Sequence, residues 1–170
     1  MKKVIGYVST KDLGTLKEQD IKNLDVINIA FGLIERHRVV WDSCGNEEYL
    51  PKIREINPDI KIVLSVGGWG ADGFSQAART EEGRALFAVS AVSLVETYGL
   101  DGIDIDWEYP GTSLAGIGSH VNDKENYTLL LKALRESLNH MEGEKSLSVA
   151  VGGDVYFALQ TDMKAASNRR

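Results

Sequence analysis

The sequence predicts an α/β fold with a parallel sheet. Short apolar stretches alternate with stretches of helical periodicity along the chain, and no internal repeat or low-complexity tract interrupts the series. In the middle of the series, residues 101–110 show the period-two alternation of a β-strand. Because each expected strand is separated from the next by a helix, the strands should lie parallel, with right-handed crossovers.

The elements expected along the chain follow from apolar stretches and from helix-ending residues. Strands are expected at 3–9, 26–31, 61–66, 101–108 and 146–151, and helices at 16–24, 47–56, 80–98 and 123–136. A loop and a further helix are expected over 154–166, after the last strand. The second of these helices should end near Asn57, because the residue before a proline disfavours the helical conformation, and Pro58 follows.

The third and fourth helices carry clear signals at their ends. Thr80 is a good N-cap residue, and two glutamates follow it, where acids favour a helix start. Gly99 is placed to end that helix. Residues 111–123 are rich in Gly and Ser and predict a loop, after which Asp123 begins a helix. One apolar stripe of this helix consists of Tyr127, Leu130, Leu131 and Leu134.

Composition limits the class of protein and its partners. The chain has 170 residues, of which 43% are hydrophobic and 26% charged, as is usual for a globular domain. Its net charge of -6 and pI near 5.1 argue against nucleic acid or an anionic membrane as partner. The only compact basic patch, at residues 35–38, is expected to be a solvated loop rather than a phosphate site. Cys44 is the single cysteine, so no intrachain disulfide is expected.

The amino-terminal residues bear on localisation. Lys2 and Lys3 are basic, but no apolar stretch long enough for a signal peptide follows them. No segment is long and apolar enough to cross a membrane. The localisation is therefore unknown from the sequence: it is cytoplasmic if the sequence is taken as it stands, and secreted if a leader has been removed.

The acidic run has two chemically different faces. Asp104, Asp106 and Glu108 share one parity and line one face of the expected strand. Ile103 and Ile105, together with Trp107, occupy the other face and should pack against an apolar layer. A strand that aims three carboxylates from one face is costly if its role is stability alone.

The spacing of these acids has an electrostatic consequence. Residues i and i+2 of a strand lie about 6.6 Å apart, where two negative charges repel by roughly 2.5 kcal/mol at an effective dielectric of about 20. We therefore expect one carboxyl group to retain a proton and the acids to titrate together. This pattern favours general acid catalysis of glycoside cleavage.

The alternatives are a calcium site or a salt-bridged strand. Calcium usually takes its oxygen ligands from a loop that also supplies Asn, Gly and backbone carbonyls, which this run does not resemble. No metal and no cofactor is therefore expected. The neighbouring strands support an active site, because small residues share one parity there: Ser65 and Gly67 in one strand, and Ser148, Ala150 and Gly152 in the other.

Two motifs resemble those of the family 18 glycoside hydrolases, the chitinases and their relatives. The motif DxxDxDxE is present as Asp101, Asp104, Asp106 and Glu108, followed by Tyr109 and a proline. The motif SxGG is present as Ser65, Gly67 and Gly68 with the intervening valine, followed by Trp69. The order and separation of the two motifs match a (β/α)8, or TIM, barrel. The resemblance therefore implies a partial TIM (β/α)8 barrel.

The resemblance also implies roles for the acids. Glu108 corresponds to the general acid that protonates the glycosidic oxygen. The family is one of the substrate-assisted exceptions, in which the N-acetyl oxygen of the sugar acts as nucleophile. Asp106 corresponds to the residue that orients this group, and Asp104 to the residue that shares a proton with Asp106. Asp101 and Ser65, with Gly67 and Gly68, correspond to structural supports of the site.

Aromatic residues are expected to bind the sugar. The resemblance places Tyr7, Phe31, Trp69 and Tyr109 at the substrate site, where aromatic faces can stack on sugar rings. Packing in the core is the alternative for each of them. Trp107 and Trp41 are assigned to packing, because nothing places them in the groove.

The resemblance covers residues 1–170 as an incomplete catalytic domain that contains about the first five βα units. In the family, the sixth strand carries a Met-x-Tyr-Asp motif whose Tyr and Asp help to hold the acetamido group, and a late tryptophan forms the floor of the site. Neither has a counterpart here, and 170 residues are fewer than the roughly 250 of such barrels. The sequence thus suggests a fragment that is poorly active alone and that can self-associate through open barrel edges.

Three functional hypotheses remain open. The first is a retaining, substrate-assisted hydrolase of β-1,4-linked N-acetylglucosamine polymers, that is, of chitin or chito-oligosaccharides. The second is an endo-β-N-acetylglucosaminidase that acts on glycans, and the third is a non-catalytic, lectin-like chitin-binding protein. Glu108 counts against the third, because such relatives usually lose this acid.

Overall fold

The computed structural model describes residues 2–153 and 161–162, and in it five parallel strands form one sheet. These strands are β1 (Ile5–Ser9), β2 (Val26–Glu35), β4 (Lys61–Gly67), β5 (Gly102–Asp106) and β6 (Ser146–Val149). Their spatial order is β1-β2-β4-β5-β6, and every neighbouring pair is parallel. The prediction of an α/β fold with parallel strands is confirmed.

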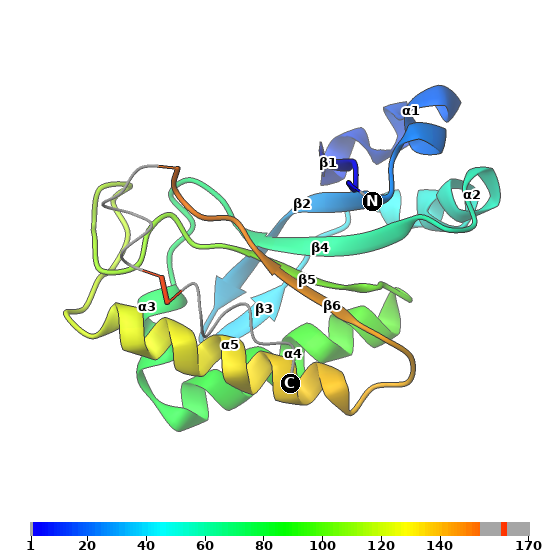
Figure 1. Cartoon of the computed structure of the whole chain (residues 1–170). Coiled ribbons are helices and arrows are strands. Elements are labelled where there is room, and N and C mark those ends of the chain that lie inside the picture. The colour runs from blue at the N-terminus through cyan, green and yellow to red at the C-terminus, as the bar shows by residue number, and fades with distance from the viewer. Residues whose placement is uncertain (1, 154–160, 163–170) are drawn as a thin grey trace.

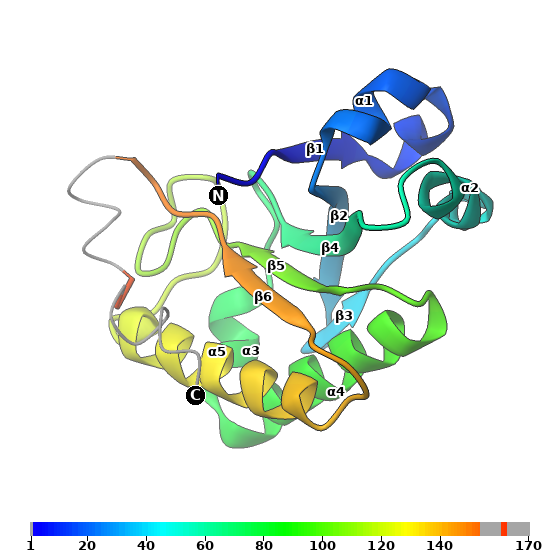
Figure 2. The ribbon, with the colours of Figure 1, turned by 45° about the vertical axis from the view of Figure 1, so that its right-hand side comes forward.

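The helices lie between the strands in sequence, as expected. They are α1 (Glu18–Asn23), α2 (Tyr49–Ile56), α3 (Phe74–Arg79), α4 (Glu81–Thr97) and α5 (Asp123–Asn139). In Figures 1 and 2, α3, α4 and α5 pack together along one side of the sheet, and α1 and α2 lie beside each other near β1 and β2. Two 3-10 turns, Thr10–Thr15 and Asn46–Glu48, precede α1 and α2.

The two faces of the sheet differ in chemistry. The face toward the helices carries aliphatic residues of the core, among them Ile29, Leu64, Ile103 and Ile105, all fully buried. Asp104 and Ser65 have the opposite parity and lie on the inner face. The expected separation of isoleucines from acids along β5 is therefore confirmed. It leaves the inner face of the sheet polar and available for chemistry.

The helix-end signals were read correctly. Thr80 is the N-cap of α4, and its hydroxyl accepts a hydrogen bond from the Gly83 N–H at 3.0 Å. In α5, the stripe formed by Tyr127 and its three leucine neighbours is buried, as predicted. These two helices pack against each other beneath β5 and β6. They provide the apolar layer that the outer face of β5 requires.

Other elements differ from the prediction. Strand β2 is longer than the expected 26–31, because its end pairs with a short antiparallel strand, β3 (Arg38–Val40). The basic patch forms the turn between these strands, where Arg36 and His37 have positive φ angles. Helix α3 was not expected. The predicted loop and helix at 154–166 lie mostly outside the described residues.

In the part of the chain that the structure describes, the helices are all too short or too polar to cross a membrane.

Candidate active site

Strand β5 places Asp104 and Asp106 on the inner face of the sheet. The strand register aligns Asp104 with Ser65 of β4 and with Ser148 of β6. Glu108 lies two residues beyond the end of β5, at the edge where active sites of (β/α) barrels are found. The predicted common orientation is confirmed for Asp104 and Asp106, with Ser65 beside Asp104, whereas Glu108 lies outside the strand that was expected to carry it.

Asp104 is a buried carboxylate that accepts hydrogen bonds from hydroxyl groups of three strands. Tyr7 Oη donates to Oδ2 at 2.9 Å, and Ser65 Oγ donates to the same oxygen at 2.8 Å. Ser148 Oγ donates to Oδ1 at 2.6 Å. The Asp104 side chain is only 2% exposed. The three donors compensate for the removal of its carboxylate from water.

Asp106 is the acid with the raised pKa. Burial, followed by the negative charges of Glu108 and Asp104, raises the pKa of Asp106 from 3.8 to about 6. The sequence led us to expect one acid of the run to keep its proton at neutral pH. Asp106 is the acid that tends in this direction, but with a pKa of about 6 it is mostly ionised at pH 7. A carboxyl group that titrates near neutral pH can donate or accept a proton during a reaction.

Tyr7 reaches the acids from β1, the strand at one end of the sheet. Burial and the charge of Asp104 raise the pKa of Tyr7 to about 12, although a hydrogen bond with Asn28 acts in the opposite direction. Tyr7 therefore remains protonated at neutral pH and can donate its hydroxyl hydrogen to Asp104. Strand register places Asn28 next to Tyr7 on the same face, where it is nearly fully buried.

Trp107 anchors the backbone just before Glu108. Its ring stacks on Phe74 of α3 with 5.2 Å between centroids and 9° between planes. Tyr127 of α5 meets the same ring edge-on at 5.2 Å. Trp107 is only 2% exposed, and Trp41 is also buried. Both tryptophans therefore pack in the core, as predicted.

Gly67 and Gly68 allow β4 to approach β5 and Phe31 closely. The Gly67 φ angle is 123°, and a Cβ atom there would lie 2.1 Å from the Asp106 carbonyl oxygen. The Gly68 N–H donates to the same oxygen at 2.9 Å. A Cβ atom on Gly68 would lie 2.8 Å from the Phe31 ring. These two glycines hold the backbone of Asp106 and the aromatic ring in place.

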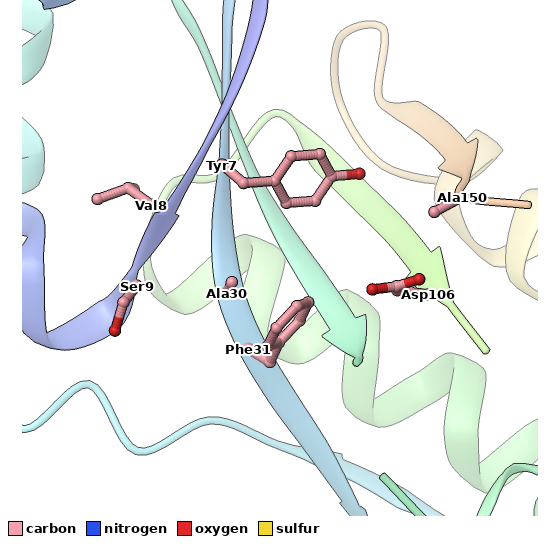
Figure 3. A pocket seen from close by; sticks show the side chains of 7 residues that line it. All are labelled: Tyr7, Val8, Ser9, Ala30, Phe31, Asp106 and Ala150. Atoms are coloured by element: carbon pink, nitrogen blue, oxygen red, sulfur yellow. The ribbon is translucent and has the colours of Figure 1, made fainter. Parts of the chain in front are cut away.

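A cavity opens beside Asp106. Its volume is about 560 Å³, and its lining consists of Tyr7, Val8, Ser9, Ala30, Phe31, Asp106 and Ala150. In Figure 3 the Tyr7 and Phe31 rings and the Asp106 carboxyl group surround one open space between β1, β2 and β5. A cavity that joins aromatic faces to acidic groups is suited to a sugar.

The predicted aromatic residues are exposed to different extents. Tyr7 is 53% exposed, Phe31 39% and Trp69 67%, so none of these three is a core residue. Trp69 lies in the loop after β4 and does not line the cavity. Tyr109 is half-buried and directly follows Glu108. The structure thus brings Tyr7 and Phe31 together with the acids, while Trp69 and Tyr109 lie on adjoining loops.

Asp101 lies apart from the other acids, before the start of β5. Its Oδ2 accepts a hydrogen bond from the Ile62 N–H at 2.9 Å and one from Arg54 at 2.9 Å. Although burial acts in the opposite direction, these hydrogen bonds and the charges of Arg54 and Lys61 lower the pKa of Asp101. Asp101 therefore supports the packing of β4 and β5 and does not contact Asp104.

Opposite pKa shifts at Asp106 and Asp101 predict opposite effects on stability. The folded protein retains a proton on Asp106 that the unfolded chain releases, so its contribution to stability falls as the pH rises from 3.8 to about 6. Asparagine cannot ionise, so Asp106→Asn should avoid this loss of stability. We expect it to raise the free energy of unfolding at pH 7 by about 1 kcal/mol, after allowance for the partial exposure of the side chain. Asp101→Asn should lower it, because the contribution of Asp101 is present at neutral pH and is lost as the pH falls.

Urea unfolding of both variants and of the parent chain at pH 4 and pH 7 measures these differences. An Asp106→Asn variant that is less stable than the parent at pH 7 would contradict the raised pKa.

Sequence reasoning missed two polar residues of the site. Ser148 was noted only as a small inward residue, although the register with Asp104 could have identified it as a donor. Asn28 lies within an apolar strand, where a single polar residue on the inner face was its only signal. In the described ranges, no group of three or more His, Cys, Asp or Glu residues is arranged to hold a metal ion.

The fold and the site define a class of protein. Five parallel strands, with acids near the carboxyl end of the fourth, correspond to the amino-terminal part of a (β/α)8 barrel. The sequence profile of the glycosyl hydrolases family 18 matches residues 3–169. The chain therefore belongs to glycoside hydrolase family 18.

Individual relatives are consistent with this family. The chain is similar to a family 18 N-acetylglucosaminidase from Paenibacillus barengoltzii, with 44% identity and a TM-score of 0.92, over 97% of this chain and 50% of that chain. It is similar to the chitinase domain of the spore coat protein CotE from Clostridium difficile, with 36% identity and a TM-score of 0.83, over 95% and 45% of the two chains. It is 40% identical to Chitinase A1 of Niallia circulans over 72% of this chain and 19% of that protein. The chain thus spans half or less of the length of these relatives.

Proposed function

We propose that this chain is the acid-bearing part of a hydrolase that cleaves β-1,4-linked N-acetylglucosamine polymers. The single observation that carries the proposal is the position of Asp106. It lies between the charges of Asp104 and Glu108, has a raised pKa, and borders a cavity with aromatic walls. Such an arrangement has little value for stability and suits acid catalysis on a sugar.

Glu108 is the proposed general acid. It lies beyond the end of β5, and its charge acts on Asp106. In the proposed reaction, Glu108 protonates the glycosidic oxygen as the bond to the leaving sugar breaks. The N-acetyl oxygen of the retained sugar attacks the anomeric carbon, so that the configuration is retained after water completes the reaction.

Asp106 and Asp104 orient and stabilise the reacting acetamido group in this proposal. Asp106 in its protonated or ionised form contacts the acetamido group, whose nitrogen becomes positively charged as the ring closes. The hydroxyl groups of Tyr7, Ser65 and Ser148 hold Asp104 in place behind Asp106. Preorganised groups of this kind account for a large part of enzymatic rate enhancement.

The exposed aromatic residues are proposed to bind the sugar chain. Tyr7 and Phe31 line the cavity beside Asp106, and Trp69 and Tyr109 extend the aromatic surface onto neighbouring loops. Chitin or chito-oligosaccharides are the proposed partners, because each of their rings offers an apolar face for stacking and an acetamido group for Asp106.

A second candidate is an N-acetylglucosaminidase that releases single sugars. The similarity to the Paenibacillus barengoltzii enzyme favours it, since that relative has 44% identity over nearly all of this chain. The two candidates share the chemistry at Glu108 and differ in where a polymer is cut. Endo-β-N-acetylglucosaminidase action on glycans, the other enzymatic hypothesis from the sequence, has no observation in its favour.

The test uses a chimera in which this chain replaces the matching half of the Paenibacillus barengoltzii enzyme. The high structural similarity makes the replacement feasible. The chimera should hydrolyse chito-oligosaccharides, and the first products should keep the β configuration, as measured by NMR. Release of N-acetylglucosamine alone from chitohexaose supports the second candidate, and release of oligosaccharides supports the first. A folded chimera that hydrolyses none of these substrates would refute the proposed function.

A further inference from the structure

Asp123 carries a fully buried carboxyl group without a cationic partner. Its exposure is 0%, and among the described residues no Lys, Arg or His forms an ion pair with it. Burying a carboxylate is costly unless hydrogen bonds compensate for the lost water. None of the proposed catalytic steps uses Asp123. Its location at the start of α5 therefore calls for another explanation.

Two hydrogen bonds to one oxygen of Asp123 close the base of a loop. The loop comprises residues 107–122 and connects β5 to α5. Near its beginning, the Gly111 N–H donates to Asp123 Oδ2 at 3.3 Å. Near its end, the His120 N–H donates to the same oxygen at 2.7 Å. One carboxylate oxygen thus holds together two backbone positions that are nine residues apart.

The other oxygen of Asp123 ties the loop base to α3. Ser75 Oγ donates to Asp123 Oδ1 at 2.8 Å, and Ser75 is itself 1% exposed. The residue before Ser75 is Phe74, which stacks on Trp107. The same two helices, α3 and α5, therefore hold the chain on both sides of Glu108. Trp107 is fixed by Phe74 and Tyr127, and Gly111 is fixed by Asp123.

A separate anchor holds the far part of the loop. The Gly118 N–H donates to Asp72 Oδ1 at 2.9 Å, and Asp72 belongs to the loop after β4. A Cβ atom on Gly118 would lie 2.6 Å from Gln76 Nε2, so the loop packs closely against α3 there. This contact is ten residues from Glu108 in sequence, whereas the Gly111 contact is three residues away.

We propose that Asp123 is a positioning residue for Glu108: its carboxylate closes the base of the loop of residues 107–122 and so fixes the direction in which the general acid points. The inference rests on the proposed function of Glu108. Asp123 does not touch the substrate, and it acts through the backbone of Gly111. Alanine at this position would leave the Gly111 and His120 N–H groups without this acceptor and would open the base of the loop.

The test compares two substrates in the chimera. Asp123→Ala should lower kcat for chito-oligosaccharides by about 10²-fold, the loss expected for a catalytic group displaced by about 1 Å. Hydrolysis of the 2,4-dinitrophenyl glycoside of chitobiose should fall by no more than about threefold, because this leaving group departs without protonation. KM for both substrates should stay near the value of the parent chimera.

Asp72→Ala is the matched control. It makes the same chemical change to a carboxylate of a neighbouring loop that also accepts from the 107–122 loop. In this control, the ratio of the rate on chito-oligosaccharides to the rate on the dinitrophenyl glycoside should equal the ratio in the parent chimera. Hydrogen–deuterium exchange of the peptide 107–122 should increase in both variants, so that loosening of the loop is separated from its effect on Glu108.

The outcomes separate this inference from the proposed function. Loss of activity on the natural linkage alone supports positioning of the general acid. An equal loss on both substrates would overturn it, since a purely structural defect lowers both rates together. If Asp123→Ala does not fold, Asp123→Ser serves instead, because a serine hydroxyl is accepted at a helix start but is too short to close the loop. A parent chimera without hydrolysis would refute the proposed function and not the loop geometry, which the exchange measurement reports.

Discussion

Glu108→Gln in the chimera is expected to reduce hydrolysis of chito-oligosaccharides by about 10² to 10⁴-fold, the usual contribution of a general acid. Glutamine keeps the shape of the side chain but has no proton to transfer to the glycosidic oxygen. Binding of the oligosaccharide, measured by calorimetry, should be nearly unchanged. The variant should retain more activity on the dinitrophenyl glycoside, whose leaving group does not need the acid.

The control for this variant is Glu96→Gln, which makes the same change on the exposed surface of α4. Its turnover should equal that of the parent chimera. Unchanged turnover in Glu108→Gln would exclude Glu108 as the acid and would remove the basis for assigning a positioning role to Asp123.

The 170-residue chain produced alone is expected to show little or no turnover and to self-associate. Among the described strands, β1 and β6 are the two ends of the sheet, and each pairs with one neighbour only. Unpaired strand edges favour pairing with another chain. The inner side chains of β1 are also open to solvent, with Ile5 at 52% and Tyr7 at 53% exposure.

The expected lack of turnover of the 170-residue chain has a cause separate from its self-association. The family resemblance places two further donors to the acetamido group on a sixth strand, which the described residues do not include. Loss of one preorganised donor costs about 10² to 10³ in rate. Light scattering at several concentrations measures association, and an assay on chitotriose measures turnover, with the chimera as the monomeric control. A monomeric 170-residue chain with the turnover of the chimera would show that five strands are sufficient.

The sequence predicted the sheet and the acid face because both depend on local periodicity. The alternation of Asp104 and Asp106 with two isoleucines specified which side chains face inward, and Ser65 and Ser148 could be aligned with them by parity. The helix α4 was predicted well because Thr80 marks its start.

The elements that were missed depend on contacts that no local pattern reveals. Strand β3 contains Arg38 next to a charged turn, a pattern typical of a loop. It pairs with residues 33–35 of β2, which extend beyond the pairing of β2 with β1 and β4. Helix α3 has only six residues, too few to show a helical period. The role of Asp123 depends on donors at Ser75, Gly111 and His120 that only the folded chain brings together. The sequence marked Asp123 simply as the first residue of a helix.

The hydroxyl groups of Tyr7, Ser65 and Ser148 that surround Asp104 also become available in a fixed order during synthesis. Tyr7 is 97 residues before Asp104 in the sequence, and Ser148 is 44 residues after it. During synthesis, Tyr7 and Ser65 are therefore available to Asp104 as soon as β5 has been made, whereas the hydrogen bond from Ser148 must wait until β6 has docked. Contacts between residues so distant in sequence form slowly. The hydrogen bond from Ser148 to Asp104 is therefore the last of the three to form, after every other strand of the described sheet has been made.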